Sequence, residues 1–143
     1  MELNQLKELY EAYIAKTAKV MADAPTFAGV WGWGDDPKKH PCHMEFYEAV
    51  ESFLAEFLSR SQPEEAAYAV ADWIIRTPAG YKDQAVFWYM FAAHGLCKPL
   101  IPLLSPDHCA ALRDFYDDHY PKFDRMPVQR ELYKGLKKGA KGR

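Results

Sequence analysis

The sequence predicts an all-α fold, a single-domain bundle of five or six helices around a buried central helix, with one long ordered loop after the first helix. Three observations predict it. Apolar residues recur at spacings of three and four, and no stretch alternates cleanly enough to be a strand. The segment 81–97 is apolar on nearly every side. The 143 residues, 49% of them hydrophobic, suit one domain that buries a substantial core.

The first two helices follow from apolar spacing and from two prolines. The first is expected over residues 3–21, and it should end before Pro25 because the residue preceding a proline avoids the helical region. The second is expected over residues 41–60, since Pro41 suits a first helical turn, where its missing N–H would be unpaired anyway. The apolar stripes are Leu6, Tyr10, Tyr13, Thr17 and Val20 on the first helix, and Phe46, Val50, Phe53, Leu54 and Phe57 on the second.

The third and fourth helices differ in their surroundings. The third is expected over residues 62–76, because Glu64 and Glu65 complement the positive end of the helix dipole. The fourth, over residues 81–97, is apolar all round, which is typical of a buried helix, and we place it at the centre of the bundle. Pro99 should end it, and residues 100–104 should form a packed coil or one short turn.

The C-terminal part contains one strong helix start. Ser105-Pro106-Asp107 combines a capping serine, a proline at the first turn and an acid, so a fifth helix is expected from there to about His119. Pro127 begins a last short helix that should reach Leu136. We therefore expect a helical domain over residues 1–136 and a flexible basic tail over residues 137–143.

Composition limits the classes of partner. The formal net charge is −2, so no overall field attracts nucleic acid or anionic lipid, and we expect neither as a partner. Three cysteines are an odd number without disulfide-like spacing. The N-terminal residues lack the apolar stretch of a signal peptide, and the longest uncharged apolar run, 85–93, is too short to span a bilayer. These features predict a reduced, cytoplasmic and soluble protein.

The stretch WGWGDDPKKHPCH, residues 31–43, carries the first candidate site. Glycines beside Trp31 and Trp33 let the backbone turn while the rings lie flat against the core or a ligand. Asp35 and Asp36 either present carboxylates to that ligand or form a turn that ends in a solvated acid pair. The turn is the favoured interpretation of the acids. The four residues are nonetheless the candidate ligand-binding set.

A zinc site is the second candidate. Histidine and thiolate are the usual zinc ligands, and a set of His40, Cys42, His43, His94 and Cys97 is imaginable, with the last two three residues apart on one helix face. The sequence contains no C-x-x-C and no H-E-x-x-H. The favoured alternative is that the cysteines fill core positions and that a buried neutral histidine has two hydrogen-bond partners and no metal.

No catalytic motif, such as a phosphate-binding glycine loop or G-x-S-x-G, is present. Cys42, near a helix start, is the best candidate for a reactive thiol, but this alone does not predict an enzyme. We expect a non-catalytic protein-interaction or self-association module, with a protein partner or a homodimer. The alternative is a helical protein that binds a metal, zinc first, or a small ligand in a pocket between the central helix and the Trp31–His43 loop.

Overall fold

The structure, a computed structural model, describes residues 2–23, 41–80 and 93–142. Within these ranges every regular element is helical and no strand occurs, so the all-α prediction is confirmed. The α-helices are α1 (Leu3–Asp23), α2 (Pro41–Leu58), α3 (Glu64–Arg76), α5 (Pro106–His119) and α6 (Pro127–Ala140), and the 3₁₀ helices are η2 (Thr77–Gly80), η4 (His94–Leu103) and η5 (Lys122–Asp124).

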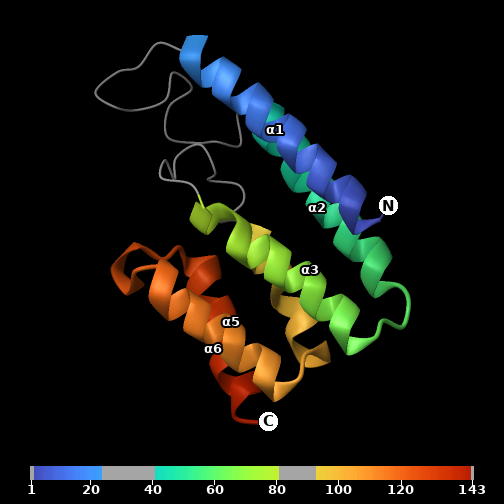
Figure 1. Ribbon diagram of the computed structural model, residues 1–143, viewed down its shortest axis with the longest axis vertical. Helices are drawn as coiled ribbons and strands as arrows, with labels where there is room; N and C mark the ends of the chain where they lie inside the picture. The colour runs from blue at the N-terminus through green and yellow to red at the C-terminus, as the bar shows by residue number, and fades with distance from the viewer. Residues whose placement is uncertain (1, 24–40, 81–92, 143) are drawn as a thin grey trace.

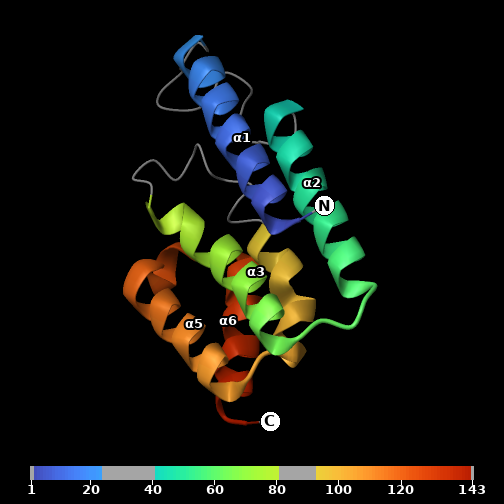
Figure 2. The same ribbon diagram turned by 45° about the vertical axis from the view of Figure 1, so that its right-hand side comes forward.

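The helices form two pairs joined through α3 and η4. In both views α1 lies along α2 in the upper part of the molecule, and α5 lies with α6 in the lower part (Figures 1 and 2). The 3₁₀ helix η4 contacts α6, α3 and α2. It therefore connects the lower pair to the rest of the bundle.

Aromatic rings fill the contact between α1, α2 and α3. The rings of Tyr13 and Phe46 stack with centroids 5.0 Å apart, and Tyr10 meets the Trp73 ring edge-on at 5.7 Å. Leu6, Tyr10 and Tyr13 are buried. This confirms the inward face predicted for the described part of the first helix, in which aromatics at helical spacing belong to the core.

The start of α5 is as the sequence predicts. The Ser105 side chain accepts a hydrogen bond of 3.2 Å from the backbone N–H of His108, and Pro106 occupies the first turn. The capping serine satisfies one of the backbone donors that have no partner within the helix. The helix ends at His119, also as predicted.

The predicted central helix is described only at its C-terminal end. Residues 81–92 lie outside the described residues, as does the predicted long loop over 24–40. At this end the structure agrees with the predicted burial of the helix, because Ala93, His94 and Cys97 are all fully buried. The central position of the helix and the order of the loop therefore stay predictions.

The segment after Pro99 differs in part from the predicted stop followed by a packed coil or one short turn. The chain continues as a 3₁₀ helix from His94 to Leu103, with Pro99 and Pro102 inside it. The backbone angle that proline imposes lies within the 3₁₀ range, so the two rings are compatible with this helix. Leu100 and Ile101 are buried, and this packing stabilises a 3₁₀ helix longer than most.

Two glycines let η4 and α6 approach closely. A Cβ atom added at Gly95 would lie 3.0 Å from the Cβ of Val128, and one added at Gly135 would lie 2.8 Å from Cδ1 of Ile101. Both separations are shorter than an ordinary van der Waals contact between carbon atoms. The absence of a side chain at these two positions therefore sets how near the helices come.

The last helix is longer than predicted. It reaches Ala140 rather than Leu136, and Gly139, which lies in the predicted flexible tail, is buried. Lys137 and Lys138 lie in the last turn, where cations complement the helix dipole. The predicted boundary at residue 136 thus falls inside α6, and the flexibility of residues 137–143 stays a prediction.

We predict that Gly95→Ala destabilises the fold more than Gly135→Ala. The new methyl at Gly95 meets the Cβ of Val128, which cannot move without its backbone, so the free energy of unfolding should fall by about 1–2 kcal/mol. At Gly135 the obstacle is the terminal methyl of Ile101, which can rotate, and alanine gains up to about 1 kcal/mol in helix propensity. Urea unfolding measures the loss in free energy of unfolding for each variant. An equal loss in the two variants, or a larger loss in Gly135→Ala, would contradict the prediction.

Candidate functional site

Most of the candidate site residues predicted from the sequence fall where the structure gives no side-chain description. Trp31, Trp33, Asp35, Asp36 and His40 lie outside the described residues. Cys42 and His43 belong to the first turn of α2, but their side chains also lie outside the description. The described candidates are thus His94 and Cys97, in the first turn of η4.

His94 is fully buried and lies in a polar cluster. Its Nδ1 is 2.6 Å from the hydroxyl oxygen of Tyr116 and 3.5 Å from Nε2 of Gln129. The orientation of the Gln129 amide is fixed, because its Oε1 accepts a hydrogen bond of 2.9 Å from the backbone N–H of Met126. Nδ1 therefore faces an O–H and an N–H donor. We assign it as the acceptor, which places the ring proton on Nε2.

Burial controls the charge of His94. Loss of solvation lowers its pKa from 6.5 to about 3, and a hydrogen bond with the backbone of Ile74 acts in the opposite direction. The imidazole is therefore neutral at pH 7. The alternative that the sequence favoured over a metal ligand, a buried neutral histidine with two hydrogen-bond partners, stays a prediction.

Cys97 is in a similarly apolar setting. It is fully buried, and burial raises the pKa of its thiol well above the ordinary value. Because the thiolate is the form that binds metals and attacks electrophiles, Cys97 is not prepared for either task at pH 7. Among the described residues, no three His, Cys, Asp or Glu side chains are grouped closely enough to hold a metal ion. A zinc site that uses residues 40–43 stays a prediction.

A buried arginine joins α5 to α6 beside this cluster. The Arg125 side chain is 6% exposed, and its Nε donates a 2.9 Å hydrogen bond to the carbonyl oxygen of Tyr120. One Nη donates to the carbonyl of Tyr116 at 3.3 Å and lies 3.5 Å from the Asp117 carboxylate. The guanidinium also lies over the Tyr133 ring, 4.3 Å from its centroid. These contacts satisfy carbonyls at the end of α5, so the role of Arg125 is structural.

A second polar cluster joins the starts of α3 and α5. Oε2 of Glu64 accepts hydrogen bonds from the Ser105 backbone N–H at 2.9 Å and from Nδ1 of His108 at 2.6 Å. The imidazole stacks on the Tyr68 ring with centroids 3.7 Å apart. The hydrogen bond from Ser105 and that from His108 lower the pKa of Glu64. A carboxylate, an imidazole and a hydroxyl meet here, but the hydroxyl caps a helix, and we interpret the cluster as a clamp between two helix starts.

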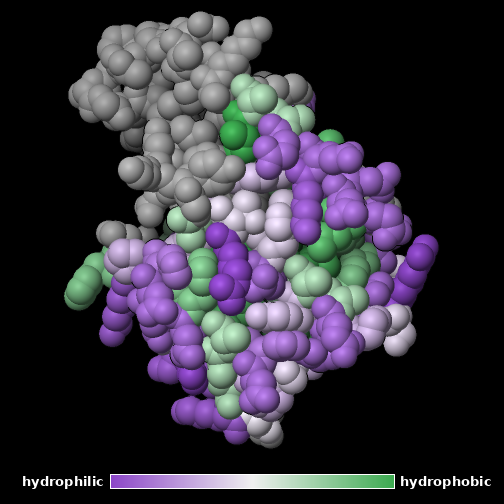
Figure 3. Space-filling view, viewed as in Figure 1, coloured by the Kyte–Doolittle hydropathy of each residue, from purple (hydrophilic) through white to green (hydrophobic). Residues whose placement is uncertain are grey.

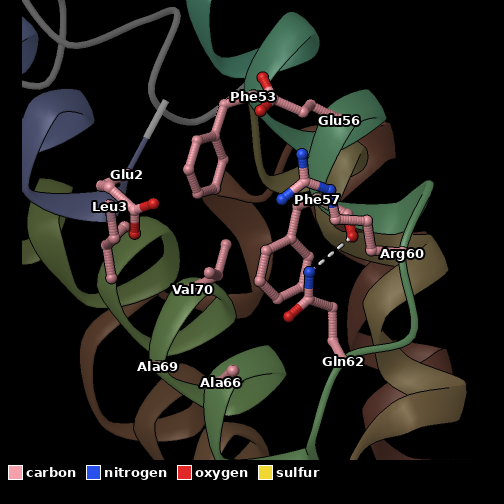
Figure 4. Close-up of a pocket in the computed structure, with 10 residues that line it drawn as sticks. All are labelled: Glu2, Leu3, Phe53, Glu56, Phe57, Arg60, Gln62, Ala66, Ala69 and Val70. Atoms are coloured by element: carbon pink, nitrogen blue, oxygen red, sulfur yellow. Dashed lines mark hydrogen bonds between the residues drawn. The ribbon is translucent and has the colours of Figure 1, made fainter.

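An apolar groove opens where α1, α2 and α3 meet. Figure 3 shows apolar surface at this place, with hydrophilic side chains around it. The groove has a volume of about 360 Å³. It is lined by Glu2, Leu3, Phe53, Glu56, Phe57, Arg60, Gln62, Ala66, Ala69 and Val70 (Figure 4).

The polar groups of the groove lie on its rim. Figure 4 shows the rings of Phe53 and Phe57 beside the side chain of Val70, with the Arg60 guanidinium drawn between the two rings. Glu2, Glu56 and Arg60 are all exposed, as expected of groups at the edge of the groove. Gln62 closes one end, where its Nε2 donates a 2.9 Å hydrogen bond to the carbonyl oxygen of Phe57. The sequence placed both phenylalanines on the inward stripe of the second helix. Phe57 is nevertheless only half-buried, so the last turns of α2 are incompletely covered by the described residues.

Comparison with known proteins finds no match to a family model, a curated protein or a solved structure. Among the residues that the structure describes, no helix has both the length and the apolar content required to cross a membrane. A function for this chain is therefore inferred from the geometry of the sites themselves.

We predict that Tyr116→Phe costs about 1–3 kcal/mol of the free energy of unfolding, because it removes a donor from a buried acceptor on His94. Tyr133→Phe is the matched control. It removes a hydroxyl that donates to the exposed Asp117 carboxylate at 2.7 Å, and should cost less than about 1 kcal/mol. Chemical denaturation measures both losses, and equal losses would argue against the buried cluster as a source of stability.

We predict that stability decreases as the pH falls below 6.5. In the unfolded chain His94 takes up a proton near its ordinary pKa of 6.5, whereas in the folded chain burial holds that pKa at about 3. The free energy of unfolding should therefore fall by up to about 1.4 kcal/mol per pH unit. Glu64, whose folded pKa lies below its ordinary 4.5, adds a loss only below about pH 4.5.

Between pH 6.5 and 4.5, His94 therefore contributes to the pH dependence of the free energy of unfolding, whereas Glu64 does not. Urea unfolding at three pH values in this interval measures the slope. Nitrogen NMR of the imidazole identifies the residue responsible: the His94 ring should keep the shifts of the neutral form protonated on Nε2 throughout. Titration of that ring near pH 6.5 in the folded protein would show that the assignment of a neutral buried imidazole is wrong.

Proposed function

We propose that this chain is a non-catalytic protein-interaction module, and that the groove between α1, α2 and α3 receives an apolar side chain of its partner. The arrangement of the groove carries the proposal. Its centre is aromatic and aliphatic, and its charged groups are confined to the rim. Protein interfaces have this anatomy, with an apolar core rich in aromatic residues and a polar edge.

A small-ligand site has a different arrangement. Such sites hold a few polar groups that converge inside the cavity and fix the orientation of the ligand. In this groove Phe53 is buried and Phe57 is half-buried, whereas the charged residues of the lining, Glu2, Glu56 and Arg60, are exposed. This favours a partner that inserts an apolar group and exchanges charge at the edge.

The charge of the rim suggests the chemistry of the partner. Glu2 and Glu56 contribute two negative charges, and Arg60 contributes one positive charge. A partner whose apolar side chain enters the groove, and whose neighbouring residue is basic, would place a positive charge near the two glutamates of the rim. We therefore propose a partner that presents a large apolar residue next to a lysine or arginine.

Two further predictions from the sequence, the cellular location and the alternative of a metal or small ligand, also belong to this proposal. A cytoplasmic location is part of the proposal and rests on the odd number of cysteines without disulfide-like spacing. The alternative, a metal or small ligand held near residues 31–43, rests on side chains outside the described residues. We retain it as a prediction without further argument.

Selection of random peptides displayed on phage tests the groove. Ala69 is exposed and lines the groove from α3, so Ala69→Arg should cover the opening without disturbing the core. Ala12→Arg is the matched control, because Ala12 is equally exposed on α1 and does not line the groove. We expect the wild-type chain to enrich peptides with a large apolar residue beside a basic one.

Fluorescence anisotropy then measures the affinity of an enriched peptide for each variant. Ala69→Arg should weaken binding about tenfold or more, as expected when an interface anchor is blocked, and Ala12→Arg should leave it unchanged. If no peptide is enriched, or if the peptides bind both variants equally, the groove is not the binding site.

A further inference from the structure

Charge is segregated between two exposed helices of this chain. Between Pro41 and Leu58, α2 contains four glutamates and neither lysine nor arginine. Between Pro127 and Ala140, α6 contains four basic residues and one glutamate, and Lys141 follows directly. The net charge of −2 conceals this separation.

The basic residues of α6 form a single stripe. At 100° per residue, the five positions fall within a sector of about 100°. All are exposed, and the opposite side of the helix is buried through Leu132, Leu136 and Gly139. We call these residues the basic stripe: Arg130, Lys134, Lys137, Lys138 and Lys141.

The glutamates of α2 form a matching face. All four are exposed, whereas Phe46, Val50, Phe53 and Leu54 on the other side of the helix are buried. The face extends over twelve residues, as the basic stripe does, and the eleven steps between first and last span about 16 Å at 1.5 Å per residue. We call these residues the acidic face: Glu45, Glu48, Glu51 and Glu56.

An apolar anchor lies next to the basic stripe. Phe123 is 96% exposed in the 3₁₀ turn η5, just before α6 begins, and its neighbour Lys122 is also exposed. A large apolar residue beside a basic one is the partner chemistry that the rim of the groove favours. The groove in turn lies at the end of the acidic face, because Glu56 belongs to both.

We infer that the partner is a second copy of this chain, whose Phe123 enters the groove while its basic stripe lies antiparallel along the acidic face. Figures 1 and 2 show α2 and α6 in different parts of the molecule, and the charged side chains of both helices that form the two surfaces are exposed. The direction follows from the anchor: Phe123 at the Glu56 end places Arg130 near Glu56 and Lys141 near Glu45. This inference rests on the proposed function of the groove and names its occupant.

The contact depends on charge at its edge, so it responds to salt. The screening length falls from about 10 Å at 0.1 M to about 3 Å at 1 M ionic strength. Light scattering and sedimentation at about 100 μM protein should show a mass above that of the monomer at 50 mM salt. At 500 mM salt the dissociation constant should rise about tenfold, because exposed charge pairs are screened.

Complementary charge reversals test the pairing. Lys134→Glu with Lys137→Glu lowers the net charge of the basic stripe from +5 to +1 and places two acids opposite the middle of the acidic face. Glu48→Lys with Glu51→Lys changes the net charge of the acidic face from −4 to 0 and places two bases opposite the middle of the basic stripe. Each variant alone should be monomeric, because like charges then oppose one another. An equimolar mixture of the two variants should associate again, since the two acids introduced on α6 of one variant then lie opposite the two bases introduced on α2 of the other, and the second pair of surfaces is unchanged.

Two further variants complete the design. Phe123→Ser should give a monomer with unchanged unfolding, because this side chain is exposed. Glu8→Lys with Glu11→Lys, two exposed positions on α1, changes charge equally outside both surfaces and should keep the wild-type mass. Circular dichroism confirms the folding of each variant.

The outcomes separate the two proposals. A monomeric wild-type chain at 50 mM salt, or a mixture that fails to associate, overturns the second copy as the partner. If selected peptides still bind the groove and lose affinity in Ala69→Arg, the proposed function stands without it. If peptides also fail to bind, both proposals are wrong. Association that persists in either charge-reversed variant alone overturns the pairing of the two surfaces.

Discussion

The buried hydrogen bond between the imidazole of His94 and the hydroxyl of Tyr116 holds the lower half of the molecule together. It joins η4 to α5, and Gln129 extends the cluster to α6. In the apolar interior, a buried polar group without a hydrogen-bond partner costs free energy. The three side chains of the cluster can form their hydrogen bonds only in one arrangement, so the cluster fixes the relative positions of three helices. Gly95, the next residue after His94, lets η4 approach α6 closely beside this cluster.

Much of the fold can be predicted from the sequence, because the local preferences of the residues agree with the final structure. The cap at Ser105, the proline starts at residues 41 and 106, and the aromatic faces of the first two helices follow from backbone geometry and apolar spacing alone. Each of these features is decided within a few residues along the chain. Tertiary contacts reinforce them and do not change them.

The features that differ from the prediction depend on contacts between distant segments. A proline usually ends a helix, but burial of Leu100 and Ile101 carries η4 past Pro99. Gly139 looks like a frayed end in the sequence, whereas its burial extends α6. The partners of His94 come from positions 22 and 35 residues away, and Glu64 meets His108 across 44 residues. Spacing within one segment carries no signal for such contacts.

The turn that carries Phe123 is held on both sides. Before it, the hydroxyl of Tyr120 donates to the carbonyl of Ile75, and after it the guanidinium of Arg125 is enclosed between the end of α5 and the Tyr133 ring. An exposed ring on a loose segment would lose conformational entropy whenever it became ordered in a complex. Here hydrogen bonds hold the backbone on either side of the Phe123 ring before a partner binds. The segment that carries the ring therefore loses little further conformational entropy when a complex forms.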